Sequence, residues 1–416
     1  MRLMSLNNGP NCRLSTRRQF LSATLLAGAG GVLSGPLRLS AAAEVDLPFA
    51  NGHRRMASFP QKRPLILVTS RPPQLETPFS VFNEGILTPN DSFFVRYHLS
   101  QIPTAIDPDE FRLLIKGKVS SPLSLSIEDL KSKFEPVELV AVNQCSGNSR
   151  GFSQPRVAGG QTGNGAMGNA RWKGVPLKDL LNKAGVAAGA RQVTFQGLDR
   201  PVIEQTPAFV KAINVDHALD GEVMVAYHMN DQDLPMLNGF PLRLVVPGCY
   251  GTYWVKHLNE ITVVGEEFTG FWMSTAYRIP DNAGACVEPG STPAKTKPID
   301  RLNVRSFVTS IADGDKVPLG KPLSIRGIAF DGGYGIQSVR VSEDGGRTWR
   351  ETELGRDYGK YSFREWTYPF VAQEAGNHEI KVCASNRIGQ TQPTTPLWNP
   401  AGYMRNVTET VHFSAA

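Results

Sequence analysis

Cys145 is the residue of this chain whose surroundings point most directly to chemistry. It follows the apolar run 137–142, which predicts a buried strand, and it lies in the small, polar segment Asn143–Arg150. A thiol in such a loop, with the cation of Arg150 five residues later, is placed for access and ionisation rather than for packing. These features indicate a metal ligand or a nucleophile, and a structural cysteine remains the alternative.

A second pair of candidate residues ends the segment Asn90–His98. Arg96 and His98 are two positions apart, so a strand places both side chains on one face. A guanidinium offers planar, paired donors to an oxyanion. The segment therefore predicts an oxyanion site, and a solvent-exposed strand with a surface arginine is the alternative.

Two further segments add cations and a tyrosine. The run Gly239–Gly248 reads as a buried strand that carries Arg243, and Lys256 follows it closely, so the two cations can neutralise a phosphate. The aromatic run Phe271–Pro280 contains Tyr277, whose hydroxyl can serve a polar site. Taken alone, both segments also fit an ordinary core.

Short strands separated by long loops must position these residues. Seven apolar runs predict strands at 93–97, 111–116, 137–142, 192–196, 223–227, 242–246 and 260–264, and two segments predict helices at 126–133 and 177–184. The alternation is too irregular for a doubly wound parallel sheet. We therefore expect an α+β fold, with a mixed α/β catalytic domain over 44–290. Its Pro-rich beginning, 44 to about 90, predicts an irregular arm or an extended segment laid on the core.

A second domain is expected after the Pro-rich linker 289–298. Residues 300–416 alternate with period two, contain hairpin turns and give no helix signal. This pattern predicts an immunoglobulin-like β-sandwich, a module that usually supplies an interface.

The N-terminus predicts export. Ser15–Leu21 is a twin-arginine signature, the apolar stretch 20–33 is too short to span a bilayer, and Ala41–Ala43 offers a cleavage site. We therefore expect a signal peptide over 1–43 and a periplasmic protein; the amphipathic start of a cytosolic domain is the alternative. Because the twin-arginine route carries folded proteins, it also suggests that a cofactor is inserted before export.

Charge and cysteine content exclude several classes of protein. Residues 1–43 hold five arginines and no acid, so their removal lowers the formal net charge from +6 to +1. A nearly neutral chain gives no reason to expect binding to nucleic acid or to a membrane surface. The four cysteines beyond the signal show neither CxxC nor CxxCH spacing, which argues against a zinc site, an iron–sulfur site or an attached c-type haem. Two disulfides remain the alternative for them.

Together and in this order, these segments and the β-sandwich resemble the sulfite oxidase family of molybdopterin enzymes, and within it the molybdenum subunits of bacterial sulfite:cytochrome c oxidoreductases. The resemblance implies that Cys145 ligates molybdenum, for which a soft thiolate is suited. It implies a pterin pocket formed by Phe94, Val95, Arg96, Tyr97, His98, Asp199, Asn238, Arg243 and Lys256. It places Arg96, His98, Arg150 and Tyr277 around the substrate.

Two positions depart from the animal members of that family. Asn238 stands where they have histidine, and Ala401 stands where they have a substrate-site arginine. Arg405, a few residues later, is the expected substitute for that missing cation.

The resemblance implies the periplasmic oxidation of sulfite to sulfate at one molybdenum–molybdopterin centre. Because this chain has no haem attachment motif, its electrons are expected to pass to a c-type cytochrome or a small haem c subunit. We expect a homodimer or a heterodimer, and no membrane span. A related sulfane-sulfur dehydrogenase or sulfoxide reductase is the alternative within the superfamily. A periplasmic β-rich binding protein, with Cys145 structural, is the alternative of another class.

Overall fold

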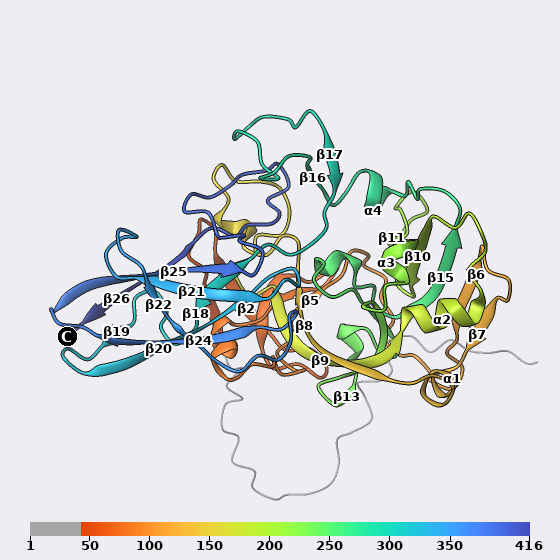
Figure 1. Cartoon of the computed structure of the whole chain (residues 1–416), viewed down its shortest axis with the longest axis horizontal. Coiled ribbons are helices and arrows are strands. Elements are labelled where there is room, and N and C mark those ends of the chain that lie inside the picture. The colour runs from red at the N-terminus through yellow and green to blue at the C-terminus, as the bar shows by residue number, and fades with distance from the viewer. Residues whose placement is uncertain (1–42) are drawn as a thin grey trace, which may run out of the picture. The chain divides into compact units, whose positions relative to one another are not determined.

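The computed structural model describes residues 43–416 (Figure 1). The predicted signal peptide therefore lies, apart from Ala43, outside the described residues. Among the residues described, none of the helices has the length and apolar composition that a membrane crossing needs.

The N-terminal residues form a sheet, so the prediction of an irregular arm was wrong. Five short strands pair antiparallel in chain order: β1 (Glu44–Asp46), β2 (His53–Ala57), β3 (Leu65–Thr69), β4 (Gln74–Glu76) and β5 (Val95–Arg96). Proline and turn residues interrupt these strands, and β5 reaches its partner only after the 3₁₀ turn η1 (Phe79–Asn83). Local patterns do not report such nonlocal pairing. The sheet places Arg96 opposite Gln74.

Two larger sheets hold most of the predicted strands. One has the order β11-β10-β15-β6-β7 and includes a parallel pair, β15 with β6; the other has the order β13-β12-β9-β8, with β14 paired to β12. Their bounds are β6 (Leu113–Gly117), β7 (Leu123–Leu125), β8 (Val137–Gln144), β9 (Met167–Pro176), β10 (Gln192–Gly197), β11 (Val210–Asn214), β12 (Met224–Met229), β13 (Gln232–Asp233), β14 (Arg243–Val245) and β15 (Leu258–Val264). The region is strand-rich with few helices.

The two predicted helices are confirmed. Helix α1 (Ile127–Lys133) begins at a capping box, in which Asp129 N donates to Ser126 Oγ at 3.0 Å and the Asp129 carboxylate accepts from Ser126 N. Helix α2 (Leu177–Ala184) buries one apolar face. Two shorter helices, α3 (Val215–Ala218) and α4 (Phe271–Ser274), each span about one turn.

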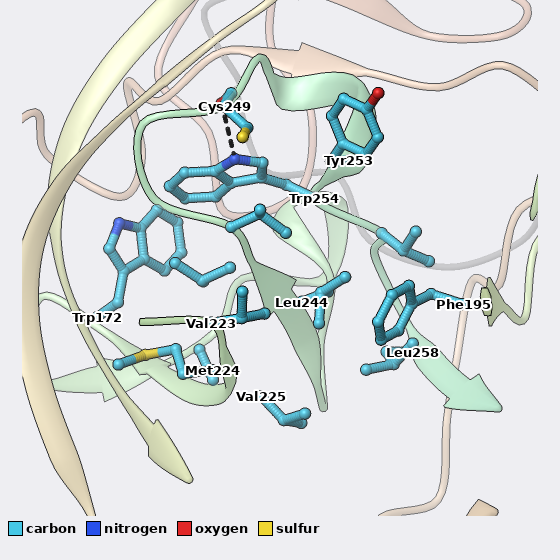
Figure 2. Packing of buried hydrophobic residues seen from close by; sticks show 14 of the residues in the cluster. Trp172, Phe195, Val223, Met224, Val225, Leu244, Cys249, Tyr253, Trp254 and Leu258 are labelled. Atoms are coloured by element: carbon cyan, nitrogen blue, oxygen red, sulfur yellow. Dashed lines mark hydrogen bonds between the residues drawn. The ribbon is translucent and has the colours of Figure 1, made fainter. Parts of the chain in front are cut away.

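The core between the larger sheets is aromatic and closely packed. Figure 2 shows the indole of Trp254 between Trp172 and Cys249, with its N–H directed to the Cys249 carbonyl oxygen at 3.1 Å. The rings of Trp172 and Trp254 lie 5.5 Å apart in an edge-to-face arrangement. Leu244 and Val245 of β14 pack in this core, which fixes the position of the strand that carries Arg243.

Residues after the ribbon of β16 (Arg278–Pro280) and β17 (Thr296–Pro298) form two sheets (Figure 1). The first is β18 (Arg305–Val308), β20 (Pro322–Phe330), β24 (Arg364–Val371) and β23 (Glu353–Leu354); the second is β19 (Lys316–Val317), β26 (Glu409–Ala415), β25 (Gly376–Asn386), β21 (Ile336–Ser342) and β22 (Arg350–Glu351). Both sheets contribute to one apolar cluster, which includes Ile325, Trp366, Val382 and Phe413. We refer to this part as the C-terminal sandwich.

The C-terminal sandwich also shares apolar contacts with the region before it. The side chains of Phe307, Phe330 and Phe363 belong to the same buried cluster as Trp172 and Trp254. The two predicted domains are therefore joined through buried side chains, and their predicted bounds remain predictions.

Candidate functional site

A single cavity lies where the four sequence segments meet. Strand β5 and the residues after it, the loop after β8, the segment from β14 to β15 and the residues after α4 each contribute to its wall. The lining residues are Phe94, Arg96, His98, Asn143, Cys145, Ser146, Phe209, Leu237, Asn238, Arg243, Gly251, Thr252, Trp254, Lys256 and Tyr277. Segments that are separate in sequence thus converge on one place.

The backbone holds Cys145 at the start of its loop. Strand β8 ends at Gln144, and Cys145 N then donates to the Ala166 carbonyl oxygen at 2.9 Å. The Cys145 carbonyl oxygen accepts from Asn148 N at 3.0 Å, which closes a tight turn. The side chain is half-buried, lines the cavity and forms no disulfide. The sulfur is therefore fixed in position and open to a ligand.

Arg243 and Lys256 form a basic wall of the cavity. Arg243 is buried, its Nη1 donates to the Asn238 carbonyl oxygen at 3.0 Å, and its guanidinium lies 5.2 Å from the ring of Trp172. Lys256 Nζ donates to the Arg96 carbonyl oxygen at 2.6 Å and lies 4.2 Å from the ring of Tyr97. Aromatic faces and carbonyl oxygens stabilise both cations without neutralising them.

The charge of this wall is poorly compensated. Burial, and then the nearby charge of Arg243, lower the pKa of Lys256 to about 7, whereas Asp199 acts in the opposite direction. Burial also lowers the pKa of Arg243 to about 9. A buried cation whose pKa falls in this way gains stability from a bound anion. The wall is therefore arranged for a negatively charged ligand.

Several buried polar atoms at the cavity have no hydrogen-bond partner among the described residues. They are both side-chain polar atoms of Asn143, the hydroxyls of Ser146 and Thr252, and Arg243 Nε. Because buried polar groups in folded proteins are almost always paired, unpaired groups that line one cavity indicate a polar ligand.

On another side of the cavity, His98 and Tyr277 are hydrogen-bonded through His98 Nε2 and the Tyr277 hydroxyl. The His98 ring stacks on Phe209 with centroids 3.8 Å apart. Burial, and then the charge of Arg96, hold the pKa of His98 well below its usual range, so the imidazole is neutral and can accept a hydrogen bond from the Tyr277 hydroxyl. Burial raises the pKa of Tyr277, which keeps its hydroxyl protonated. Tyr277 has a φ of 59°, in the left-handed region, as residues at functional sites often do.

Two residues beside Tyr277 were missed by the sequence analysis. Lys211 on β11 is 1% exposed, its Nζ donates to the Trp272 carbonyl oxygen at 2.7 Å, and it lies 5.1 Å from the Tyr277 ring. Burial lowers the pKa of Lys211 to about 7. Tyr403 stacks on Tyr277 with ring centroids 5.5 Å apart. A single lysine in a short strand and a tyrosine in a late loop carry no local sequence signal.

Arg150 lies one side chain away from the cavity. Its Nε donates to the Ala401 carbonyl oxygen at 3.0 Å, and its guanidinium lies 5.1 Å from the ring of Tyr403. Its charge lowers the pKa of Tyr403, which burial raises. The structure therefore places Arg150 near Tyr277 through Tyr403.

The structure does not bring Arg405 to this cavity. Arg405 Nη2 lies 4.0 Å from Glu409 Oε2, and the guanidinium lies 5.3 Å from the ring of Phe152. The chain turns through Gly402 and Met404, both with positive φ, and this turn directs Arg405 away from the position that local spacing suggested.

Three further predicted residues lie behind the cavity wall. Val95 is buried among apolar side chains of the N-terminal sheet. The Tyr97 hydroxyl is 2.6 Å from His257 Nε2. Burial raises the pKa of Asp199, and the nearby charge of Lys256 acts in the opposite direction. These residues support the residues that line the cavity.

Comparison with known proteins identifies the fold. A family model described as an oxidoreductase molybdopterin binding domain matches residues 99–272, and one described as a Mo-co oxidoreductase dimerisation domain matches 296–414. Sulfite oxidase of Gallus gallus is 35% identical over 387 residues, which cover 89% of this chain and 81% of that protein. The chain belongs to the sulfite oxidase family.

A further relative and a solved structure agree with this assignment. Sulfite oxidase of Arabidopsis thaliana is 32% identical over 383 residues, which cover 86% of this chain and 96% of that protein. The solved structure of the sulfane dehydrogenase SoxCD from Paracoccus pantotrophus has a TM-score of 0.70, covers 95% of this chain and 96% of that chain, and is 22% identical, which shows a shared fold. The resemblance to the sulfite oxidase family is thereby confirmed, and the chain is a molybdopterin oxidoreductase.

The residues of the cavity fit the cofactor that the sulfite oxidase family implies. Cys145 offers a soft sulfur ligand beside Arg243 and Lys256, whose buried charges lack full compensation. The unpaired polar atoms of Asn143, Ser146 and Thr252 line the same space. A thiolate-accepting metal carried by a polar, anionic pterin would match the sulfur, the cations and the unpaired polar atoms of this lining.

Proposed function

We propose that this protein oxidises sulfite to sulfate at a molybdenum–molybdopterin centre. The observation that carries the proposal is one cavity in which the Cys145 sulfur faces buried cations without full compensation. An anionic cofactor and an anionic substrate both match this charge. The identity of this chain to curated sulfite oxidases supports sulfite as the substrate.

Cofactor binding is assigned to four groups of residues. Cys145 supplies the metal ligand, and Arg243 and Lys256 neutralise the phosphate of the pterin. Phe94 and Asn238 line the pterin pocket, and Val95, Tyr97 and Asp199 support it from behind. When bound, the molybdenum cofactor supplies the two-electron redox chemistry and the oxygen transfer.

Substrate binding is assigned to Arg96 with the hydrogen-bonded pair His98 and Tyr277. Arg96 presents fixed donors to the sulfite oxygens, and such preorganised donors stabilise charge as it shifts during the reaction. The neutral His98 imidazole accepts the Tyr277 hydrogen, so that this hydroxyl stays in one orientation. Arg150 adds positive charge through Tyr403.

The electron acceptor is proposed to be a c-type cytochrome or a small haem c subunit in the periplasm. The twin-arginine signature of Ser15–Leu21 supports export, and the spacing of the cysteines supports a separate haem protein. The match to a dimerisation domain supports a homodimer or a heterodimer formed through the C-terminal sandwich, which we propose to be immunoglobulin-like.

A direct test is the reduction of cytochrome c by the purified, molybdenum-loaded protein. We expect reduction that depends on sulfite and that falls to background in Cys145→Ser. Cys383→Ser, which changes a cysteine buried in the C-terminal sandwich, should retain activity. Activity with a sulfane-sulfur compound and none with sulfite would refute sulfite as the substrate. Undiminished activity in Cys145→Ser would refute the role of this thiol as the metal ligand.

A further inference from the structure

Two arginines share one carboxylate beside the Cys145 loop. The Arg305 side chain on β18 is fully buried, and its Nη2 donates to Glu409 Oε1 at 2.8 Å and to Ser149 Oγ at 3.1 Å. Arg405 Nη2 lies 4.0 Å from Glu409 Oε2. Ser149 belongs to the loop that begins at Cys145, so this group of residues joins the C-terminal sandwich to that loop. We call Arg305, Arg405, Glu409 and Ser149 the arginine cluster.

The arginine cluster has more donors than acceptors. Nε and Nη1 of both arginines are buried and have no partner among the described residues. A guanidinium carries five N–H groups, has no acceptor and does not lose its charge in proteins. The Ser149 hydroxyl already donates to Asn164 Oδ1 at 2.5 Å, and the Glu409 oxygens face the Nη2 atoms. The remaining N–H groups therefore need an acceptor that the described chain does not provide.

The charge of the arginine cluster is also unbalanced. Two guanidinium groups face one carboxylate, and the groups that act on Arg305 are Glu409, Arg405 and the neutral, buried Tyr250 hydroxyl. Two apolar rings pack against these cations: the Arg305 guanidinium lies 4.4 Å from the Phe307 ring, and that of Arg405 lies 5.3 Å from the Phe152 ring. A buried charge in such surroundings is costly unless a counter-ion accompanies it.

We propose that the arginine cluster binds one small monovalent anion of chloride size, held by the unpartnered N–H groups of Arg305 and Arg405. A single negative charge balances the cluster, and the packing of Phe152 and Phe307 favours a compact ion over an oxyanion. The site is separate from the Cys145 cavity, because neither arginine lines that cavity. The anion would stabilise the junction between the C-terminal sandwich and the Cys145 loop. The inference does not depend on sulfite being the substrate.

Anomalous diffraction from crystals of the holoenzyme in sodium bromide tests the proposal directly. We expect an anomalous peak within hydrogen-bonding distance of Nε or Nη1 of Arg305 or Arg405. Electron density that refines only as water there, with no anomalous signal, would overturn the proposal. This result decides the matter whatever the variants described next do.

Thermal unfolding of the holoenzyme supplies a second readout. Replacing gluconate by chloride at constant ionic strength should raise the Tm of the wild type by about 1–3 °C, because an anion that binds only the folded state stabilises it. Arg405→Gln leaves the Arg305–Glu409 pair intact and balanced, so it should lose this rise. Arg63→Gln is the control, since Arg63 also pairs with carboxylates, those of Glu84 and Asp91, but lies near the surface.

Comparison of wild type with Arg405→Gln also removes any anion effect at the Cys145 cavity, which both proteins contain. An equal chloride-dependent rise in the two proteins would contradict the proposal. An Arg405-dependent rise that is larger in sulfate than in chloride would contradict the assignment to a small monovalent anion. Failure of sulfite oxidation would leave all of these measurements unaffected.

Discussion

Gln392 in the C-terminal sandwich and Asn143 beside Cys145 are both buried amides, but their hydrogen bonds differ. Gln392 Oε1 accepts from Ser306 Oγ at 2.5 Å and from Ala384 N at 2.9 Å, and its Nε2 donates to the carbonyl oxygens of Asn406 and Val407. Neither side-chain polar atom of Asn143 has a partner among the described residues. One amide is satisfied by the chain, and the other is left open.

One carboxylate of the C-terminal sandwich and one cation of the cavity give a similar contrast. In the C-terminal sandwich, Asp331 accepts from backbone N–H groups at Gly333 and Gly335 and from Asn386 Nδ2. At the cavity, Arg243 keeps an unpaired Nε, and burial lowers its pKa to about 9. Fully paired polar groups specify a fold, whereas unpaired ones around a cavity specify a ligand. The predictions below test this difference.

The largest effect is expected for Arg243→Met. Loss of this cation removes a charge-assisted contact with the cofactor, so the pterin that is retained during purification should fall roughly tenfold or more. The cofactor-free protein should be no less stable, because an uncompensated buried charge is also removed. Pterin content and the Tm of the cofactor-free protein measure the two effects. A stability loss with normal pterin content would show that Arg243 is structural.

A smaller effect, confined to the binding of sulfite, is expected for Arg96→Gln. Removing a charge-assisted contact of about 1.5–3 kcal/mol should raise the KM for sulfite roughly ten- to hundredfold. The kcat should change less, since the metal ligand is untouched. Steady-state kinetics with fully loaded enzyme provide the measurement, and an unchanged KM would refute this role of Arg96.

Lys211→Met should change how stability depends on pH. Burial lowers the pKa of Lys211 from its usual 10.5 to about 7, so between these values the unfolded chain binds the proton more tightly. The cost of burying the charge is full below about pH 7 and disappears as the pH rises toward 10.5. Wild type should therefore gain up to several kcal/mol relative to Lys211→Met over this window. Denaturant unfolding of both proteins at pH 7 and pH 10 measures it, and parallel pH profiles would contradict it.

The smallest effect is expected for Gln392→Ala in the C-terminal sandwich. It leaves buried partners of Gln392 unsatisfied, and the free energy of unfolding should fall by about 2 kcal/mol. Because no ligand is expected at this amide, the pterin content should match that of wild type. Loss of pterin in this variant would contradict the distinction between the paired polar groups of the C-terminal sandwich and the unpaired ones of the cavity.

The sequence predicted which residues meet at one cavity where those residues lie within short segments. Cys145, Arg96, His98, Arg243, Lys256 and Tyr277 all line the cavity. Each lies close to a strand end or beside a short helix, where the fold directs it toward a common centre. The helices 126–133 and 177–184 were also predictable, because capping residues and apolar spacing are local signals.

The remaining features depend on tertiary contacts that no local pattern reports. Lys211 reaches Tyr277 only because β11 packs against α4, and Tyr403 reaches it from a loop of the C-terminal part. Strands β4 and β5 pair across nearly twenty residues of intervening sequence. Local sequence patterns therefore could not predict the N-terminal sheet. Arg405 was assigned by its distance in sequence from Ala401, whereas the direction of the chain beyond Gly402 decides where it lies.

X-ray absorption at the molybdenum edge tests the central claim, that Cys145 is the protein's ligand to the metal, most directly. The matched control is Cys249→Ser, which changes a buried cysteine whose pKa burial raises, so that its thiol stays protonated. The account predicts molybdenum in the wild type and in Cys249→Ser with the same sulfur neighbours, and the loss of a sulfur neighbour in Cys145→Ser. A protein without molybdenum, or an unchanged sulfur shell in Cys145→Ser, would contradict it.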